Sequence, residues 1–234
     1  ERVCERVAKC INLDNIVIAL PYGDDFRTVT KMREITNHFC CYAYDIVGTS
    51  DVLSRIYMST KEHWHGRHGR SPLPEAILRV TADCPLFDPD WADNLIRLAT
   101  SADLHYAYLE VDVPQIEGQS YRFPEGLDCE FISMEAIEAA FKGATDPYDR
   151  EHVTPWIARK WQQFQKGSIT PSIDYSGMKW SVDTQADLDF VRAVYMELAG
   201  IDFRMNNVID LLTRKPELLE INGQTWRPEW IKAQ

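Results

Sequence analysis

Apolar runs alternate with amphipathic stretches along the first half of the chain. The apolar runs are short and rich in β-branched or aromatic residues, as is typical of strands, and the stretches between them have the apolar spacing of helices. We expect strands at residues 15–20, 39–44, 76–81 and 104–109. We expect helices at residues 26–37, 52–63 and 90–99. This alternation predicts parallel β-α-β units with right-handed crossovers.

The second half becomes more helical after a further expected strand at residues 127–132. Helical spacing recurs at residues 134–141, 153–165, 186–198 and 208–212, whereas glycines, prolines and basic residues at 64–74 predict a surface loop. The expected strands are almost continuously apolar, which favours a mostly parallel sheet covered on both faces. We therefore predict one α/β domain over residues 1–234, with a helical C-terminal part from about residue 185.

The composition argues against two classes of partner. A formal net charge of −11 disfavours non-specific nucleic-acid binding, which needs clustered Lys and Arg, but it still allows an anionic small substrate. No apolar run approaches the ~18 residues that a membrane span needs. The six cysteines form no C-x-x-C pair and no disulfide framework, so we expect reduced thiols in a cytoplasmic protein.

Two carboxylates follow expected strands directly. Asp83 comes after the apolar run at 76–81, and Asp183 comes after the run at 178–182, each shortly before a helix. Open α/β sheets bind ligands at the carboxyl ends of their strands, and two acids placed there suit a divalent cation that holds phosphate oxygens. The alternative is that each Asp caps the helix that follows it.

Two further polar groups have similar alternatives. Asp128 and Glu130 stand two residues apart on one face of a strand, either solvated or arranged around cations and sugar hydroxyls. Arg150, Glu151 and His152 combine a guanidinium, a carboxylate and an imidazole beside a helix start. They are suited to anion recognition and proton transfer, or they form an ion-pair cluster at the helix end.

Four motifs in this order resemble a known family. They are Arg-Val-Thr-Ala-Asp-Cys-Pro at 79–85, Pro-Glu-Gly-Leu-Asp-Cys-Glu at 124–130, Arg-Glu-His-Val-Thr-Pro-Trp at 150–156 and Val-Asp-Thr-Gln-Ala-Asp-Leu at 182–188. The chain resembles the cytidylyltransferase-like proteins of spore-coat polysaccharide biosynthesis over about residues 1–212. That family is related to the acylneuraminate and 3-deoxy-octulosonate cytidylyltransferases, which make CMP-activated acidic sugars.

The resemblance implies a Rossmann-like α/β/α sandwich of the nucleotide-diphospho-sugar transferase type. It implies that CTP and an acidic or amino sugar react with Mg²⁺ present to give a CMP-sugar and pyrophosphate, for surface polysaccharide or glycan biosynthesis. By the resemblance, Asp83 and Asp183 bind the metal and form the catalytic set with Arg150. The implied substrate-binding residues are Asp128, Glu130, Glu151 and His152 on the sugar side, and Ser50, Asp51 and Arg55 near the nucleotide.

The chain departs from the family at its start. Relatives open with a strand and a loop of the type Gln-Ala-Arg-Met-Gly-Ser-x-Arg-Leu-Pro-Gly-Lys, and nothing here matches it; Glu1 stands about where the next helix begins. Without that strand, its neighbours would have unpaired buried edges, which is costly. We therefore expect a trimmed piece of a longer protein, inactive without the loop; the alternative is that something else fills the gap. The alternatives are a sugar-nucleotide-dependent glycosyltransferase on the same fold and a non-catalytic remnant, and a homodimer is also left open.

Overall fold

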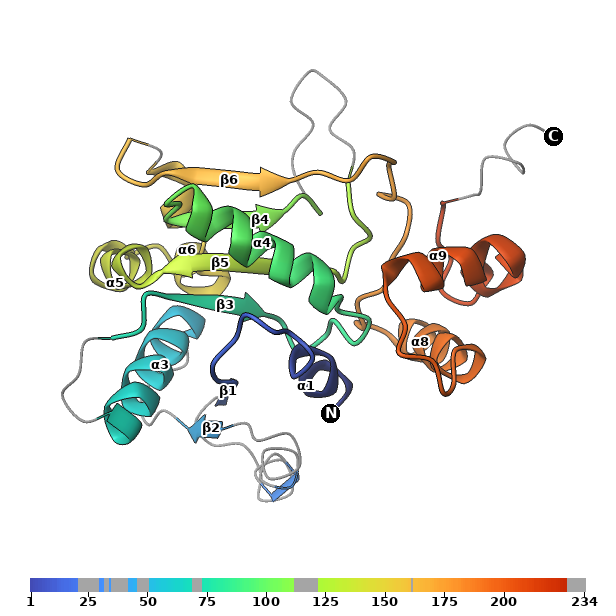
Figure 1. Ribbon diagram of the computed structural model, residues 1–234, viewed down its shortest axis with the longest axis horizontal. Coiled ribbons are helices and arrows are strands. Elements are labelled where there is room, and N and C mark those ends of the chain that lie inside the picture. The colour runs from blue at the N-terminus through green and yellow to red at the C-terminus, as the bar shows by residue number, and fades with distance from the viewer. Residues whose placement is uncertain are drawn as a thin grey trace.

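A four-stranded mixed sheet lies at the centre of the molecule (Figure 1). Its strands, in spatial order, are β3 (Ala76–Val80), β5 (Cys129–Ser133), β4 (Tyr106–Leu109) and β6 (Lys166–Ile169). β4 and β6 are parallel, whereas β5 runs antiparallel to both β3 and β4. The computed structural model describes residues 1–20, 30–31, 34, 42–45, 51–68, 73–111, 122–160 and 162–226.

A second, two-stranded sheet stands apart from the first. β1 (Val17–Leu20) and β2 (Tyr42–Asp45) pair in parallel, below β3 in the view of Figure 1. Within the described part of the chain, β3 pairs with β5 along one edge and has no strand on its other edge.

Helices cover both faces of the larger sheet, because successive strand residues point to opposite sides. On β5, Cys129 and Phe131 join one buried cluster with helix α4 (Pro89–Ser101), which crosses the front of the sheet in Figure 1. Ile132 joins a second cluster with α3 (Val52–His68), α5 (Met134–Gly143) and α7 (Pro155–Arg159). The α/β/α layering expected from the apolar strands is therefore confirmed. The expected mostly parallel order was wrong for this sheet, because β5 is antiparallel to both of its neighbours.

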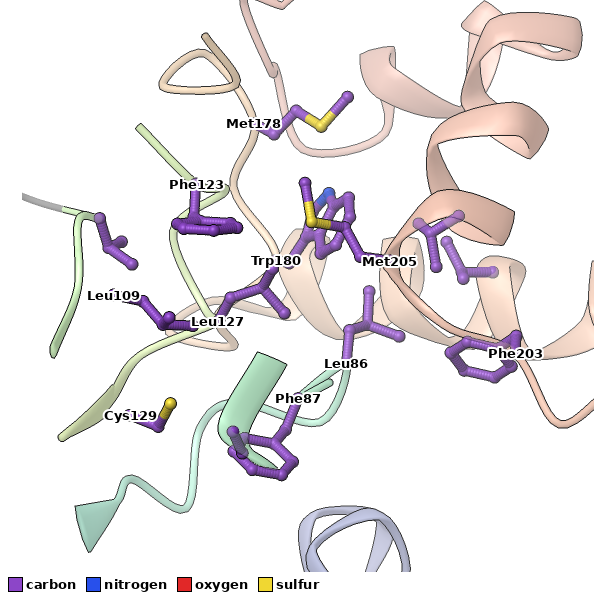
Figure 2. Close-up of a cluster of buried hydrophobic side chains, with 14 of the residues drawn as sticks. Leu86, Phe87, Leu109, Phe123, Leu127, Cys129, Met178, Trp180, Phe203 and Met205 are labelled. Atoms are coloured by element: carbon purple, nitrogen blue, oxygen red, sulfur yellow. The ribbon is translucent and has the colours of Figure 1, made fainter. Parts of the chain in front are cut away.

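The C-terminal helices lie beyond the carboxyl ends of β3, β4 and β6. They are α8 (Gln185–Glu197), α9 (Met205–Arg214) and the 3₁₀ helix η1 (Pro216–Glu220), on the right of Figure 1. The fully buried Trp180 joins them to the sheet, lying among Leu86, Leu127 and Met205 in Figure 2. The short helix α1 (Arg2–Val7) is held to the same region by its buried Arg6, which donates to the Phe203 carbonyl over 3.1 Å.

Several expected elements differ from the structure. The loop expected at 64–74 begins later, because α3 continues to His68. The helix expected at 153–165 is present only in part, as the short α7. A separate helix, α6 (Pro147–His152), ends before it, and the strand β6 follows, with a Lys-Gly-Ser-Ile sequence that carries no strand pattern. The expected strand at 178–182 is reduced to one bridge between Glu125 and Lys179.

Two expectations fall partly outside the described residues. The helix expected at 26–37 lies mostly among residues that are not described. Of the cysteines expected to be reduced, Cys4, Cys10, Cys84 and Cys129 carry free thiols, and Cys40 and Cys41 are not described. No helix in the described ranges combines the length and apolar character needed to cross a membrane.

Candidate functional site

Asp83 and Asp183 lie on two adjoining turns beyond the carboxyl end of β3. The Val182 amide donates to the Asp83 carbonyl over 2.9 Å, and both carboxylates are exposed. Neither acid caps a helix: Asp88 accepts the first amides of α4, and Thr184 caps α8 with the help of Asp187. The helix-cap alternative was therefore wrong for both residues, and the two acids face solvent from neighbouring loops.

Gly126 allows a third segment to join these turns. The Trp180 amide donates to the Glu125 carbonyl over 2.7 Å, which brings residues 122–127 alongside residues 175–181. Gly126 has φ +98°, and a Cβ there would lie 2.4 Å from the Ser181 nitrogen. Only glycine fits this contact without strain. The close approach places Asp128, two residues further on, next to the two turns.

The Cys84 thiol lies between the carboxylates of Asp83 and Asp128 and contacts both. The Cys84 thiol lies 3.6 Å from Asp83 Oδ1 and 4.0 Å from Asp128 Oδ2. Burial raises the pKa of Asp128, as do the charges of Glu130 and Asp83, against the opposing effect of a 2.8 Å hydrogen bond from the Gly126 amide. Burial likewise raises the pKa of Cys84 and keeps its thiol protonated. The Asp128 carboxylate therefore binds a proton more readily than an ordinary aspartate does.

Lys179 lies among three carboxylates on the other side of the site. Its Nζ is 2.7 Å from Asp183 Oδ2, 3.6 Å from Asp187 Oδ2 and 3.9 Å from Glu125 Oε1. The ion pair with Asp183 raises the pKa of Lys179. Burial opposes ionisation of Asp187, but hydrogen bonds from Asn222 and Thr184 outweigh it and lower the pKa of Asp187 to about 2. Both partners are therefore fully charged at neutral pH.

Glu130 is the centre of a polar network on β5. It accepts hydrogen bonds from Tyr106 (2.8 Å) and Thr154 (2.7 Å), and it pairs with Arg79, its cross-strand neighbour on β3. Thr154 reaches Glu130 through a strained γ-turn, in which buried Val153 has φ 72° and ψ −60° and the Thr154 amide donates to the His152 carbonyl. A β-branched residue in this conformation is unusual and is concentrated at functional sites.

Arg150 and Asp51 meet although they are 99 residues apart in the chain. The guanidinium donates to the Asp51 carboxylate over 3.2 Å, to Ser54 Oγ over 2.6 Å and to the carbonyls of Phe141 and Ala144. These bonds fasten α6 to the start of α3 and to the end of α5. They turn the Arg150 side chain toward the helices rather than toward the Asp83 and Asp183 turns.

The remaining predicted residues are distributed around this contact. Glu151 and His152 are exposed on α6, where the His152 ring lies 4.3 Å from that of Tyr148. Arg55 follows Asp51 in the first turn of α3, and Ser50 lies outside the described residues. The structure thus groups Asp83, Asp128 and Asp183 beyond the carboxyl end of β3. The charge of Glu130 acts on Asp128, and Asp51 pairs separately with Arg150.

Sequence reasoning missed Arg79, Tyr106, Thr154 and Lys179. Arg79 and Tyr106 stand within expected strands, and only the strand register places them beside Glu130. Lys179 had a usable signal, because it precedes Asp183 by four residues and Asp187 by eight.

The donor set is compatible with a metal that also binds phosphate. In the described ranges, no three His, Cys, Asp or Glu side chains are grouped so as to hold a metal ion. Asp83 and Asp183 offer two hard carboxylates on adjoining turns, and Lys179 pairs with Asp183. Mg²⁺ is commonly held by one or two carboxylates, with phosphate oxygens and water as the other ligands. The residues therefore fit Mg²⁺ with a bound triphosphate better than a metal held by protein alone.

Comparisons with known proteins support the fold. No family model matches the chain. It is 25% identical over 238 residues to the uncharacterized protein MJ1063 of Methanocaldococcus jannaschii, covering 100% of this chain and 87% of that protein. A cytidylyltransferase from Leptospira borgpetersenii has a similar structure, with a TM-score of 0.75 and 17% identity over 97% of this chain and 86% of that one.

Two other solved structures are similar over most of the chain. One is a CMP:2-keto-3-deoxy-manno-octonic acid synthetase complexed with CTP (TM-score 0.53, 14% identity, 84% of this chain and 86% of that one). The other is a 4-diphosphocytidyl-2C-methyl-D-erythritol synthase from Anaerococcus prevotii (TM-score 0.52, 12% identity, 84% of each chain). The chain therefore has the Rossmann-like fold of these nucleotidyltransferases.

Proposed function

We propose that this protein is a nucleotidyltransferase that joins CTP to an acidic or amino sugar, releasing pyrophosphate, for surface polysaccharide or glycan biosynthesis. The fold supports the reaction class, because the similar structures are cytidylyltransferases, one of them complexed with CTP. The observation that carries the proposal is the pair of acids on adjoining turns beyond the end of β3. Asp83 and Asp183 are exposed side by side and neither has a helix-capping role.

In this proposal Asp83 and Asp183 hold Mg²⁺ together with the triphosphate. Bound there, the ion would neutralise phosphate charge and help orient the α-phosphorus for in-line attack. The protein contributes the two carboxylates on turns that are fixed to each other by a backbone hydrogen bond. Phosphoryl transfer depends mainly on such positioning and charge neutralisation rather than on covalent help from the protein.

The sugar side of the proposed site is the Asp128–Glu130 segment and the adjoining end of α6. A sugar hydroxyl oxygen bonds to the α-phosphorus as the bond from that phosphorus to the pyrophosphate oxygen breaks. Asp128 takes the hydroxyl proton, a role favoured by its raised pKa and by its position next to Asp83. Glu130 fixes the γ-turn at Val153 to the strand, so that Glu151 and His152 face the sugar.

Pyrophosphate release tests the proposal. The full-length protein is incubated with CTP, Mg²⁺ and a panel of acidic, amino and neutral sugars, with a coupled pyrophosphate assay and mass spectrometry of the product. We expect pyrophosphate and a CMP-sugar in equal amounts. Release of a nucleoside mono- or diphosphate from a sugar nucleotide would instead identify a glycosyltransferase, and failure to bind CTP with Mg²⁺ in calorimetry would favour a non-catalytic protein.

The Asp83→Asn variant tests the residue assignment. Loss of a carboxylate ligand is expected to lower pyrophosphate release at least 100-fold, because metal catalysis typically supplies several kcal/mol. Thermal unfolding should be nearly unchanged, since the Asp83 side chain is exposed and caps no helix. Asp103→Asn, at an exposed turn after α4, is the matched control and should retain full activity. Equal activity in both variants would refute the assignment.

A further inference from the structure

Lys179 has a backbone fixed by hydrogen bonds, and among the described contacts its side chain is held only by charge. Its amide donates to Gln224 Oε1 and its carbonyl accepts from Asn222 Nδ2, each over 3.0 Å. Its ammonium group contacts carboxylates, and its side chain is one-third exposed (33%). A lysine stem has four rotatable carbons, so its charge can move several ångströms while the backbone stays in place.

The three carboxylates around Lys179 differ in their other partners. Asp187 accepts bonds from the amides of Asp183 and Thr184, the Thr184 hydroxyl and Asn222, and therefore keeps its place without Lys179. Glu125 accepts a 2.8 Å bond from Ser181 Oγ. Asp183 has a longer 3.3 Å contact with the same hydroxyl and a 2.7 Å contact with Lys179. Lys179 is thus the nearest of the described partners of the Asp183 carboxylate, one of the two proposed metal ligands.

A lysine and a divalent cation on the Asp183 carboxylate weaken each other's binding. The carboxylate has enough lone pairs to accept both, but the two positive charges would repel each other at close range. Among the described contacts, Glu125 and Asp187 pair with no cation other than Lys179. They therefore offer its ammonium group a second place, at 3.9 and 3.6 Å already. The ammonium group therefore needs only a small shift to leave Asp183.

We propose that Lys179 is a positioning residue that occupies Asp183 as an internal counter-ion and moves to Glu125 and Asp187 when the metal–nucleotide complex binds. The inference rests on the proposed function, because it takes Asp183 as a metal ligand. Two consequences follow. Lys179 keeps the free protein from binding metal tightly without nucleotide, and its positive charge offsets the mutual repulsion of the three carboxylates in the free state.

Binding of Mn²⁺ to the full-length protein without nucleotide, followed by electron paramagnetic resonance, tests the inference. Lys179→Met should bind Mn²⁺ roughly tenfold more tightly than the wild type, because a competing cation has been removed. Lys142→Met is the matched control, since Lys142 forms a 2.7 Å pair with Glu138 at the same four-residue spacing, away from the site. It should bind Mn²⁺ like the wild type, and thermal unfolding confirms that all variants are folded.

The outcomes separate this inference from the proposed function. Equal or weaker Mn²⁺ binding by Lys179→Met, with weaker binding by Asp183→Asn, would overturn the role of Lys179 and leave the metal site intact. Wild-type binding by both Asp83→Asn and Asp183→Asn would overturn the metal site itself. Absence of Mn²⁺ binding by the wild type and Lys179→Met alike would also overturn the inference, because removal of the competing charge must then have had no effect.

Discussion

Replacement of Gly126 by Ala perturbs the closest backbone approach at the candidate site. The added Cβ would lie 2.4 Å from the Ser181 nitrogen and 2.6 Å from the Trp180 carbonyl carbon. Both contacts are to backbone atoms, which cannot rotate away as a side chain can. The φ angle of +98° is also unfavourable for any residue with a Cβ.

The structure allows the cost to be worked out in two parts. The positive φ costs about 1–2 kcal/mol. Relief of the clash requires the two segments to separate by about 1 Å, which breaks the 2.7 Å bond between the Trp180 amide and the Glu125 carbonyl and weakens the neighbouring bond from Glu125 to Met178. At about 1 kcal/mol per hydrogen bond, the clash adds about 2 kcal/mol. The total, about 3–4 kcal/mol, corresponds to a fall in Tm of roughly 6–16 °C for a chain of this size.

Thermal unfolding of Gly126→Ala and Gly200→Ala isolates the clash. Gly200 has φ +79° but no atom within 4 Å of the added Cβ, so its substitution costs only the backbone term. We expect Gly200→Ala to lower Tm by about 2–8 °C and Gly126→Ala by clearly more. Equal Tm values for the two variants would refute the reasoning that the 122–127 segment is tightly packed against the Asp183 turn.

Two further predictions concern strain and pH. Because Val153 has φ 72°, we expect Val153→Gly to be more stable than Val153→Ala by about 1 kcal/mol in urea unfolding. This is the reverse of the usual order at a buried position. A more stable Ala variant would exclude the strained turn. Asp187 has a folded pKa of about 2 against 3.8 for the ordinary group, so its contribution is complete above about pH 4 and is lost as the pH falls toward about 2. The stability of the wild type over Asp187→Asn should therefore decrease by about 2 kcal/mol between about pH 5 and about pH 2, whereas a constant difference would contradict the role of the hydrogen bonds to its carboxylate.

The local pattern of the chain predicted most helices and strands well. The apolar run at 76–81 became β3 at Ala76–Val80, and the helices expected at 90–99, 134–141 and 186–198 were found within a few residues of those bounds. Such elements depend on residues close in sequence, whose period matches a helix or a strand. The strand β6 was missed because its Lys-Gly-Ser-Ile sequence has no such period, and its pairing with β4 comes from the tertiary structure.

The candidate site divides in the same way. By itself, the sequence determined that Asp83 and Asp183 follow apolar runs and that Asp128 and Glu130 stand close together, since these are relations over a few residues. Only the tertiary structure decided that neither Asp caps a helix, that Arg79 meets Glu130, and that Lys179 pairs with Asp183 beside Glu125. Strand register, the close approach at Gly126 and the packing of α6 on α3 join residues tens of positions apart, and no local pattern records which distant partner a side chain will meet.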